Sequence, residues 1–113
     1  MNQVGTAYGQ GLYTLAKEED LVQRILQELK VLQTCFAEQP EYGKLLSSHS
    51  LSKEERIRIL DGDFREKVHP YVLNFLKILT EKGYIRYFSD CCQVFIHQYL
   101  EDNGILEVYA LSA

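Results

Sequence analysis

The stretch His69-Pro-Tyr-Val-Leu-Asn-Phe-Leu-Lys-Ile-Leu-Thr-Glu-Lys-Gly83 carries the signals that begin and end an α-helix. Pro70 suits the first helical position, where its missing N–H would have no partner in any case, and Gly83 suits the left-handed residue that ends many helices. Seven of the nine residues 71–79 are apolar. At about 100° per residue, they cover most of the helix circumference. We therefore expect a helix that is buried on all sides, or one that is buried on one side and offers the other to a partner.

Two longer segments each carry a single apolar stripe. In residues 18–39 and again in residues 84–103, apolar residues recur at alternating steps of three and four. This spacing places them on one face of an α-helix. The first stripe consists of Val22, Ile25, Leu29, Leu32 and Phe36, widened by Leu21, Leu26 and Cys35. The second consists of Ile85, Phe88, Cys92, Phe95 and Tyr99. We expect two long amphipathic helices that bury these stripes.

Residues 4–17 are predicted to form a helix that is rich in glycine. Its apolar stripe consists of Val4, Tyr8, Leu12 and Leu15. The same segment contains Gly5, Gly9 and Gly11. Each glycine costs about 1 kcal/mol relative to alanine in a helix interior. Three of them in a short helix indicate that another backbone comes close, and the alternative is a helix that frays until it packs.

Two short helices are expected between the long ones. Pro40 begins the first, over residues 40–47, which directs inward Tyr42, Leu45 and Leu46. After a loop rich in serine, Ser52-x-x-Glu55 is a capping box that begins the second. The residues of this helix that face the core are Ile57 and Leu60, with Phe64 just beyond. Asp61-Gly62-Asp63 is interpreted as a turn, because it lacks the spaced oxygen ligands of a calcium loop.

The fold class predicted from these segments is all-α, a six-helix bundle with a short strand-like C-terminal tail. In residues 105–113 the apolar Leu106, Val108 and Ala110 alternate with Glu107 and Tyr109, which is a strand pattern without a partner strand in the chain. We expect residues 1–104 to form an N-terminal six-helix domain, and residues 105–113 to be a linker or the start of a missing C-terminal domain.

Composition and charge exclude several classes of function. The net charge of −4 and the pI near 5.3 argue against a nucleic-acid partner, which needs a basic surface. The longest apolar runs are a few residues, far short of the ~20 that cross a bilayer, so we expect no direct membrane insertion. No signal peptide is recognised, because a basic segment and an apolar segment are both missing near Met1.

The sequence predicts no catalytic, metal or cofactor site. The three cysteines, Cys35, Cys91 and Cys92, have no C-x-x-C spacing and are expected to be small buried apolar residues in a reducing compartment. A thiol enzyme is the alternative, and it requires Cys91 or Cys92 to be exposed and reactive. No phosphate-binding loop is recognised, and the histidines lie in different elements without ligand spacing. Composition and spacing alone favour a helical binding module.

Several motifs resemble one family in order along essentially the whole chain. Tyr8-Gly-Gln-Gly-Leu-Tyr-Thr-Leu-Ala16 resembles the Tyr-Ala-x-Ala-Leu-Phe-x-Leu-Ala signature of the delta subunit of F-type ATP synthase, the family of the oligomycin-sensitivity conferring protein. Leu73-Asn74-Phe75-Leu76 through Glu81-Lys82-Gly83 is similar to the family's Val-x-Asn-Phe-Leu-x-Leu-Leu-x-Glu-x-Gly-Arg. Pro40-Glu41 before Leu45-Leu46-Ser47 also matches, and residues 104–113 resemble the family's Gly-x-x-Glu-Ala-x-Val-x-Ser-Ala linker.

The sequence departs from the family pattern in two respects. Gly9 and Gly11 stand where the family usually has alanines, which keeps a face of small residues but weakens the helix. The family also continues into a second domain, so we expect this chain to be the N-terminal domain alone.

The resemblance implies a stator subunit that has no catalytic site and no cofactor of its own. It implies a peripheral position at the cytoplasmic face of the bacterial plasma membrane, with the missing C-terminal domain contacting the b subunit of the peripheral stalk. The N-terminal helix of an alpha subunit would bind in a groove between the first and fifth helices, residues 4–17 and 70–82. By this mapping, the partner-binding residues are Tyr8, Gly11, Leu12, Leu15, Asn74, Phe75, Ile78 and Leu79.

Other interpretations of these residues stay open from the sequence. Leu12, Phe75 and Leu79 are equally consistent with simple core positions, which leaves Tyr8, Gly11 and Ile78 as the stronger groove candidates. Two other kinds of protein fit the same helical pattern: an all-α protein–protein adaptor that is unrelated to ATP synthase, and a domain that forms a homodimer through an open apolar face.

Overall fold

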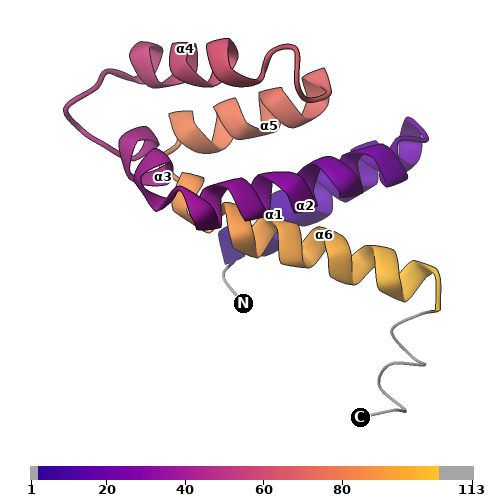
Figure 1. Ribbon diagram of the computed structural model, residues 1–113. Helices are drawn as coiled ribbons and strands as arrows, with labels where there is room; N and C mark the ends of the chain where they lie inside the picture. Colours follow the sequence, from indigo (N-terminus) through magenta and orange to yellow (C-terminus); the bar gives the residue numbers. More distant parts are fainter. Residues whose placement is uncertain (1–2, 105–113) are drawn as a thin grey trace.

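The computed structural model describes residues 3–104 and is an all-α bundle (Figure 1). Its elements are α1 (Gln3–Glu18), α2 (Val22–Glu38), α3 (Pro40–Leu46), α4 (Lys53–Phe64), α5 (Pro70–Glu81), a 3₁₀ turn η1 (Ile85–Tyr87) and α6 (Phe88–Asp102). The all-α prediction with six helices is confirmed, and no strand occurs in the described range. The strand pattern predicted for residues 105–113 lies outside the described residues.

The helices are arranged in two groups. The three long helices α1, α2 and α6 pack on one another, and α1 packs chiefly on α6 (Figure 1). The second group is the pair α4 and α5, and it joins the first through contacts of α5 with α2 and with η1. α1 therefore packs chiefly on α6, whereas α5 packs on α4, α2 and η1. This arrangement leaves a space between α1 and α5 at the surface.

Helix α5 has the predicted ends. His69 is the N-cap, and its ring Nδ1 accepts a hydrogen bond from the Tyr71 N–H at 3.0 Å. The backbone N–H of His69 donates to Glu28 Oε1 at 2.8 Å, which fixes the start of α5 to α2. At the other end Gly83 has a φ of 76°, a left-handed conformation that glycine adopts without strain.

The apolar circumference of α5 is divided between core and surface. Six of its residues are buried: Val72, Leu73, Phe75, Leu76, Leu79 and Thr80. Tyr71 and Ile78 are half-buried and Asn74 is exposed, so one side of the helix remains open. Of the two expectations for this helix, the structure has the second, burial on one side and a free apolar surface on the other.

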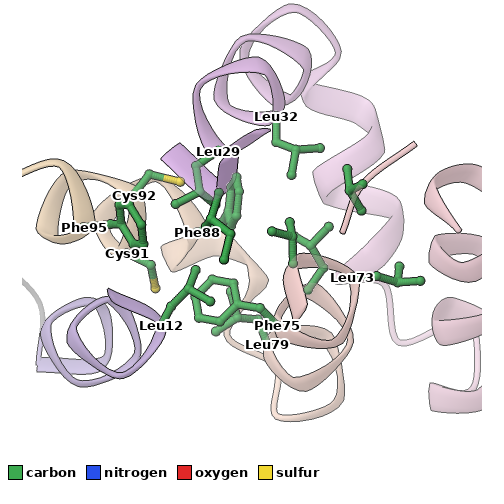
Figure 2. Packing of buried hydrophobic residues seen from close by; sticks show 14 of the residues in the cluster. Leu12, Leu29, Leu32, Leu73, Phe75, Leu79, Phe88, Cys91, Cys92 and Phe95 are labelled. Carbon is green, nitrogen blue, oxygen red and sulfur yellow. The ribbon is translucent and has the colours of Figure 1, made fainter. Parts of the chain in front are cut away.

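The hydrophobic core lies between α1, α2, α5 and α6. Figure 2 shows side chains from these helices converging on Phe88, whose ring meets those of Phe36 at 5.1 Å and Phe75 at 6.4 Å between centroids. Phe95 is fully buried and meets the Tyr13 ring edge-on at 5.1 Å. Both predicted stripes of the long helices contribute to this cluster, which confirms them as core faces.

Glycines of α1 face α6 directly. A Cβ atom built on Gly5 would lie 2.6 Å from the Cβ of Asp90, and one built on Gly9 would lie 2.6 Å from the carbonyl oxygen of Cys91. Side chains at these positions would prevent the close approach of the two helices. The predicted close approach is thus confirmed at Gly5 and Gly9, whereas at Gly11 a Cβ would meet nothing within 4 Å.

The contact with α6 sets the orientation of α1 in the bundle. Its buried residues are Gly5, Gly9, Leu12, Tyr13 and Ala16. Of the predicted stripe only Leu12 is buried, and Val4, Tyr8 and Leu15 are half-buried. The glycine side of α1 therefore packs on α6, in agreement with the predicted close approach, and most of the apolar stripe lies nearer the surface.

A side-chain network joins the C-terminal ends of α1 and α6. The Tyr13 hydroxyl donates to Asp102 Oδ2 at 2.6 Å, and Lys17 Nζ donates to the same oxygen at 3.2 Å. Burial and this hydrogen bond raise the pKa of Tyr13 to about 12. The same hydrogen bond, with that from Lys17, lowers the pKa of Asp102. The two helices therefore run parallel, tied at both ends.

Two predicted boundaries are wrong. The helix predicted over residues 18–39, α2, begins at Val22 rather than at residue 18. Glu18 belongs to α1, and Asp20 adopts a left-handed φ of 56° in the turn between the two helices. The long helix predicted from residue 84 begins instead with η1, and its α-helical part starts at Phe88.

Asp61-Gly62-Asp63 is also different from the prediction, since it lies inside α4 rather than in a turn. The carboxylate of Asp61 forms two ion pairs, each with a nitrogen–oxygen distance of 2.6 Å. One is with Arg65, one helical turn later, and the other is with Lys77 of α5. These interactions favour the helical conformation of a segment whose composition suggests a turn. The capping box at the start of α4 is confirmed, with 3.1 Å between each backbone nitrogen of Ser52 and Glu55 and the side-chain oxygen of the other residue.

Three apolar side chains that were expected in the core lie farther out. Leu45 is 39% exposed, Cys35 is exposed and Ile57 is half-buried. Leu45 and Ile57 each lie next to a residue that is buried in their place. Leu46 is fully buried beside Leu45, and Arg56, which is buried beside Ile57, donates to the Leu46 carbonyl at 3.1 Å.

The glycine contact predicts opposite effects of the same substitution at two positions. We expect Gly9→Ala to lower the free energy of unfolding by about 1–3 kcal/mol, because the new methyl group overpacks the interface with α6. Gly11→Ala is the matched control, and we expect it to raise stability by up to about 1 kcal/mol through helix propensity. Urea unfolding followed by circular dichroism measures both, and a Gly9→Ala variant as stable as the parent would contradict the contact.

Candidate partner-binding groove

An apolar groove of about 210 Å³ runs along the surface between α1 and α5. From α1 it is lined by Ala7, Tyr8, Gly11, Leu12 and Leu15. From α5 it is lined by Tyr71, Asn74, Phe75 and Ile78. The groove exists because α1 packs on α6 while α5 packs on α4 and α2, so that neither helix fills the space between them.

Seven of the eight residues predicted to bind a partner line this groove together. The exception is Leu79, which is fully buried and does not reach it. Leu12 and Phe75 form the floor and are only 5% and 7% exposed, so they belong to the core and to the groove at once. The sequence offered core and groove as alternatives for these two residues, and the structure combines them.

Two lining residues were not predicted, although the sequence contained a signal for each. Ala7 lies one helical turn before Gly11, so it shares the same face. Tyr71 lies one turn before Asn74 and Phe75 and was counted only as part of the apolar circumference of α5. A prediction that followed the helical faces, rather than the family motifs, would have included both.

Gly11 gives the groove its depth on the α1 side. It is exposed, and a Cβ atom built on it would meet nothing within 4 Å. Unlike Gly5 and Gly9, it is not required by any contact inside the described part of the molecule. Its missing side chain leaves open space at the surface, into which another backbone can approach closely.

Tyrosines stand at both ends of the groove. The Tyr71 hydroxyl donates to Glu19 Oε1 at 3.3 Å, and its ring lies 4.8 Å from the His69 ring between centroids. The negative charge of Glu19 raises the pKa of Tyr71. At the other end the Tyr8 ring meets the Tyr84 ring at 6.0 Å. These contacts place the start of α5 beside the end of α1, so the two helices run antiparallel.

The groove has no charged residue in its lining. Its polar groups are the tyrosine hydroxyls and the exposed side-chain amide of Asn74, which has no hydrogen-bond partner within residues 3–104. The arrangement suits an apolar stripe on another helix, with a few polar groups to fix orientation.

Among residues 3–104, no group of three or more His, Cys, Asp or Glu residues is placed to hold a metal ion. No helix in that range has the length and apolarity to cross a membrane. Cys91 and Cys92 are buried, as predicted, and burial raises the pKa of the Cys91 thiol to about 12. Their thiolates are therefore strongly disfavoured.

Comparison with known proteins agrees with the motifs of the sequence. The family model for "ATP synthase delta (OSCP) subunit" matches residues 4–113. The chain belongs to this family. Relatives include the ATP synthase subunit delta of Alkaliphilus oremlandii (strain OhILAs), which is 32% identical over 93 residues, 82% of this chain and 52% of that protein. The family resemblance inferred from the sequence is confirmed.

Two further delta-subunit relatives show how much of the family's length the chain covers. ATP synthase subunit delta of Prochlorococcus marinus subsp. pastoris (strain CCMP1986 / NIES-2087 / MED4) is 29% identical over 113 residues, which are 100% of this chain and 63% of that protein. That of Lachnoclostridium phytofermentans (strain ATCC 700394 / DSM 18823 / ISDg) is 30% identical over 110 residues, 97% of this chain and 60% of that protein. The chain spans about three fifths of these two curated relatives.

The burial of two thiols predicts a simple labelling pattern. We expect a disulfide-exchange reagent at pH 8 to modify Cys35 rapidly in the native protein and to reach Cys91 and Cys92 only after unfolding, because Cys35 is exposed to the reagent and the other two thiols are buried. Counting the released chromophore gives one reactive thiol before denaturant and three after it. Any fast-reacting thiol in a folded Cys35→Ser variant would instead favour the thiol-enzyme interpretation.

Proposed function

We propose that this chain is the N-terminal domain of a stator subunit of F-type ATP synthase, and that it has no catalytic role of its own. The observation that carries the proposal is the uncharged apolar groove between α1 and α5 in a member of the delta (OSCP) family. In this role the groove binds the N-terminal helix of an alpha subunit. The joint holds the catalytic head against rotation while the rotor turns.

Helix-in-groove recognition accounts for the composition of the lining. An amphipathic helix lays its apolar stripe over Leu12 and Phe75, and its backbone approaches α1 most closely above Gly11. Each apolar side chain that becomes fully buried contributes roughly 1.5–3 kcal/mol, so several of them offset the entropy lost on association. The Asn74 amide supplies a polar contact that sets the position of the helix along the groove.

The stator role requires a second attachment. By family analogy, the part of the subunit that follows residues 105–113 in longer relatives contacts the b subunit of the peripheral stalk. The assembled subunit would then lie peripherally at the cytoplasmic face of the bacterial plasma membrane. Its load passes from the alpha helix through the six-helix domain to the stalk, without any chemical step in the domain.

A homodimer through the same groove is the competing interpretation, whereas family membership disfavours an unrelated adaptor. A twofold interface would place the groove of one copy against that of another, and a shallow concave surface is a poor match for itself. Sedimentation equilibrium separates the two interpretations. A monomer at micromolar concentration supports a different partner protein, and a stable dimer supports self-association.

Introducing a charge into the groove is expected to abolish binding. Ile78 is half-buried and lines the groove, so Ile78→Asp places a carboxylate where an apolar stripe must dock. Calorimetry with a synthetic peptide of the alpha N-terminal helix should show no heat of binding, while the melting temperature falls little. Ile96→Asp on α6, also half-buried, is the matched control and should bind normally. Unchanged affinity in a folded Ile78→Asp protein would contradict the groove assignment.

Filling the groove with a larger side chain is expected to abolish binding while it increases the stability of the domain. We expect Gly11→Leu to block the alpha peptide while the free energy of unfolding rises by up to about 1 kcal/mol, since leucine is the better helix former and the site is open. Gly62→Leu makes the same change at another exposed helical glycine with no neighbour within 4 Å. It should gain similar stability and keep full affinity. Equal affinities of both variants, measured by the same calorimetry, would overturn the proposed binding mode.

A further inference from the structure

A second groove lies on another part of the surface, where the C-terminal half of α2, α3 and η1 meet. Its volume is about 410 Å³. Its apolar lining consists of Phe36, Ala37, Pro40, Ile85 and Phe88. None of these residues lines the groove between α1 and α5, so the two surfaces are separate. We call it the α3–η1 groove.

The α3–η1 groove carries only positive charge. Lys44 of α3 and Arg86 of η1 line it, and no carboxylate does. Both side chains are exposed, and within residues 3–104 neither forms an ion pair. The chain as a whole has a net charge of −4, so the positive charge of this groove is opposite in sign to the net charge of the protein.

The guanidinium of Arg86 is held in place before any partner arrives. Its central carbon lies 4.9 Å from the centroid of the Tyr87 ring. Stacking on an aromatic face leaves the N–H groups at the edge of the guanidinium available for a carboxylate. Less side-chain entropy is then lost when an ion pair forms, compared with a freely moving arginine.

Gly43 adds an open approach from α3. It lines the groove, and a Cβ atom built on it would meet nothing within 4 Å. A glycine inside a helix costs about 1 kcal/mol relative to alanine, and no contact in the described residues requires this one. The position has the same property as Gly11 in the other groove: space for a second backbone above a helix.

A neighbouring hollow on the other side of α3 provides a contrast. It is lined by the exposed Leu45 together with Glu41, Asp63 and Lys67, so its charges are of both signs. Charge complementarity selects no partner there. In the α3–η1 groove the charges do indicate a partner. An apolar floor flanked by Lys44 and Arg86 is complementary to a segment whose apolar residues are flanked by carboxylates.

We propose that the α3–η1 groove binds a partner protein through an acidic amphipathic helix, in which a stripe of apolar side chains is flanked by carboxylates. The apolar stripe covers Phe36 and Ile85, and the flanking carboxylates pair with Lys44 and Arg86. This surface is additional to the proposed binding of the alpha helix between α1 and α5.

Two synthetic peptides of identical length and apolar pattern test the proposal. One carries Glu at every flanking position and the other carries Lys. We expect the full 113-residue chain to bind the acidic peptide about tenfold more tightly than the basic one at low salt, with the difference shrinking as salt rises. Amide shifts in ¹H–¹⁵N spectra should concentrate at Ala37, Gly43 and Ser89. Equal affinity for both peptides, or shifts confined to the α1–α5 groove, would overturn it.

Charge reversal with a matched control completes the test. Lys44→Glu with Arg86→Glu should weaken binding of the acidic peptide by about tenfold or more. Lys53→Glu with Arg58→Glu changes the net charge equally on the exposed surface of α4, outside both grooves, and should change the affinity less than about twofold. Gly11→Leu should leave this binding intact, which distinguishes it from the alpha-helix site. If the double reversal has no effect, or if the groove residues instead shift with protein concentration as a dimer forms, the proposal fails.

Discussion

The close contact between α1 and α6 determines the arrangement of the rest of the molecule. At Gly5 and Gly9 the two helices approach so closely that no Cβ atom fits between them. The most apolar side of α1 is therefore not buried against its main neighbour but lies at the edge, facing α5. If the apolar stripe of α1 faced α6 instead, the half-buried Tyr8 would be covered by the bundle, and the surface between α1 and α5 would be closed. The groove is in this sense a product of packing on its far side.

Helix α5 complements this arrangement because it is apolar almost all round. If α5 had a single apolar face, that face would pack against α2 and α4, and a polar face would be turned toward α1. Here Leu76 and Leu79 serve the core, while Ile78 and Tyr71 remain at the groove. Both ends of α5 are also fixed. At its start the backbone N–H of His69 donates to Glu28, and after its end Gly83 adopts the left-handed conformation of the turn. Position and composition together give one helix two distinct roles.

The sequence allowed most of the fold and much of the groove to be predicted, and the errors have a common physical cause. Periodicity shows which residues share a helical face, as for Val22 and Ile25, but not which neighbour that face meets. By periodicity the three glycines of α1 look alike, although Gly5 and Gly9 face α6 closely and a Cβ atom on Gly11 would meet nothing within 4 Å. Leu79 shares the spacing of the groove residues but points into the core. Asp61-Gly62-Asp63 has the composition of a turn, and its helical state depends on ion pairs of Asp61 with Arg65 and with Lys77 of α5, which the local composition does not reveal.

The floor of the groove has a mechanical consequence. Leu12 and Phe75 are exposed at the groove with only a few per cent of their surface. The rest of each side chain packs among the buried residues of the core (Figure 2). A force on a helix seated there is thus transmitted to close-packed side chains of four helices rather than to surface residues that can bend aside. Such interiors have low compressibility, so they pass on a pull with little deformation. In the proposed role, Leu12 and Phe75 would contact the bound helix directly and pass the force to the core residues that they pack against.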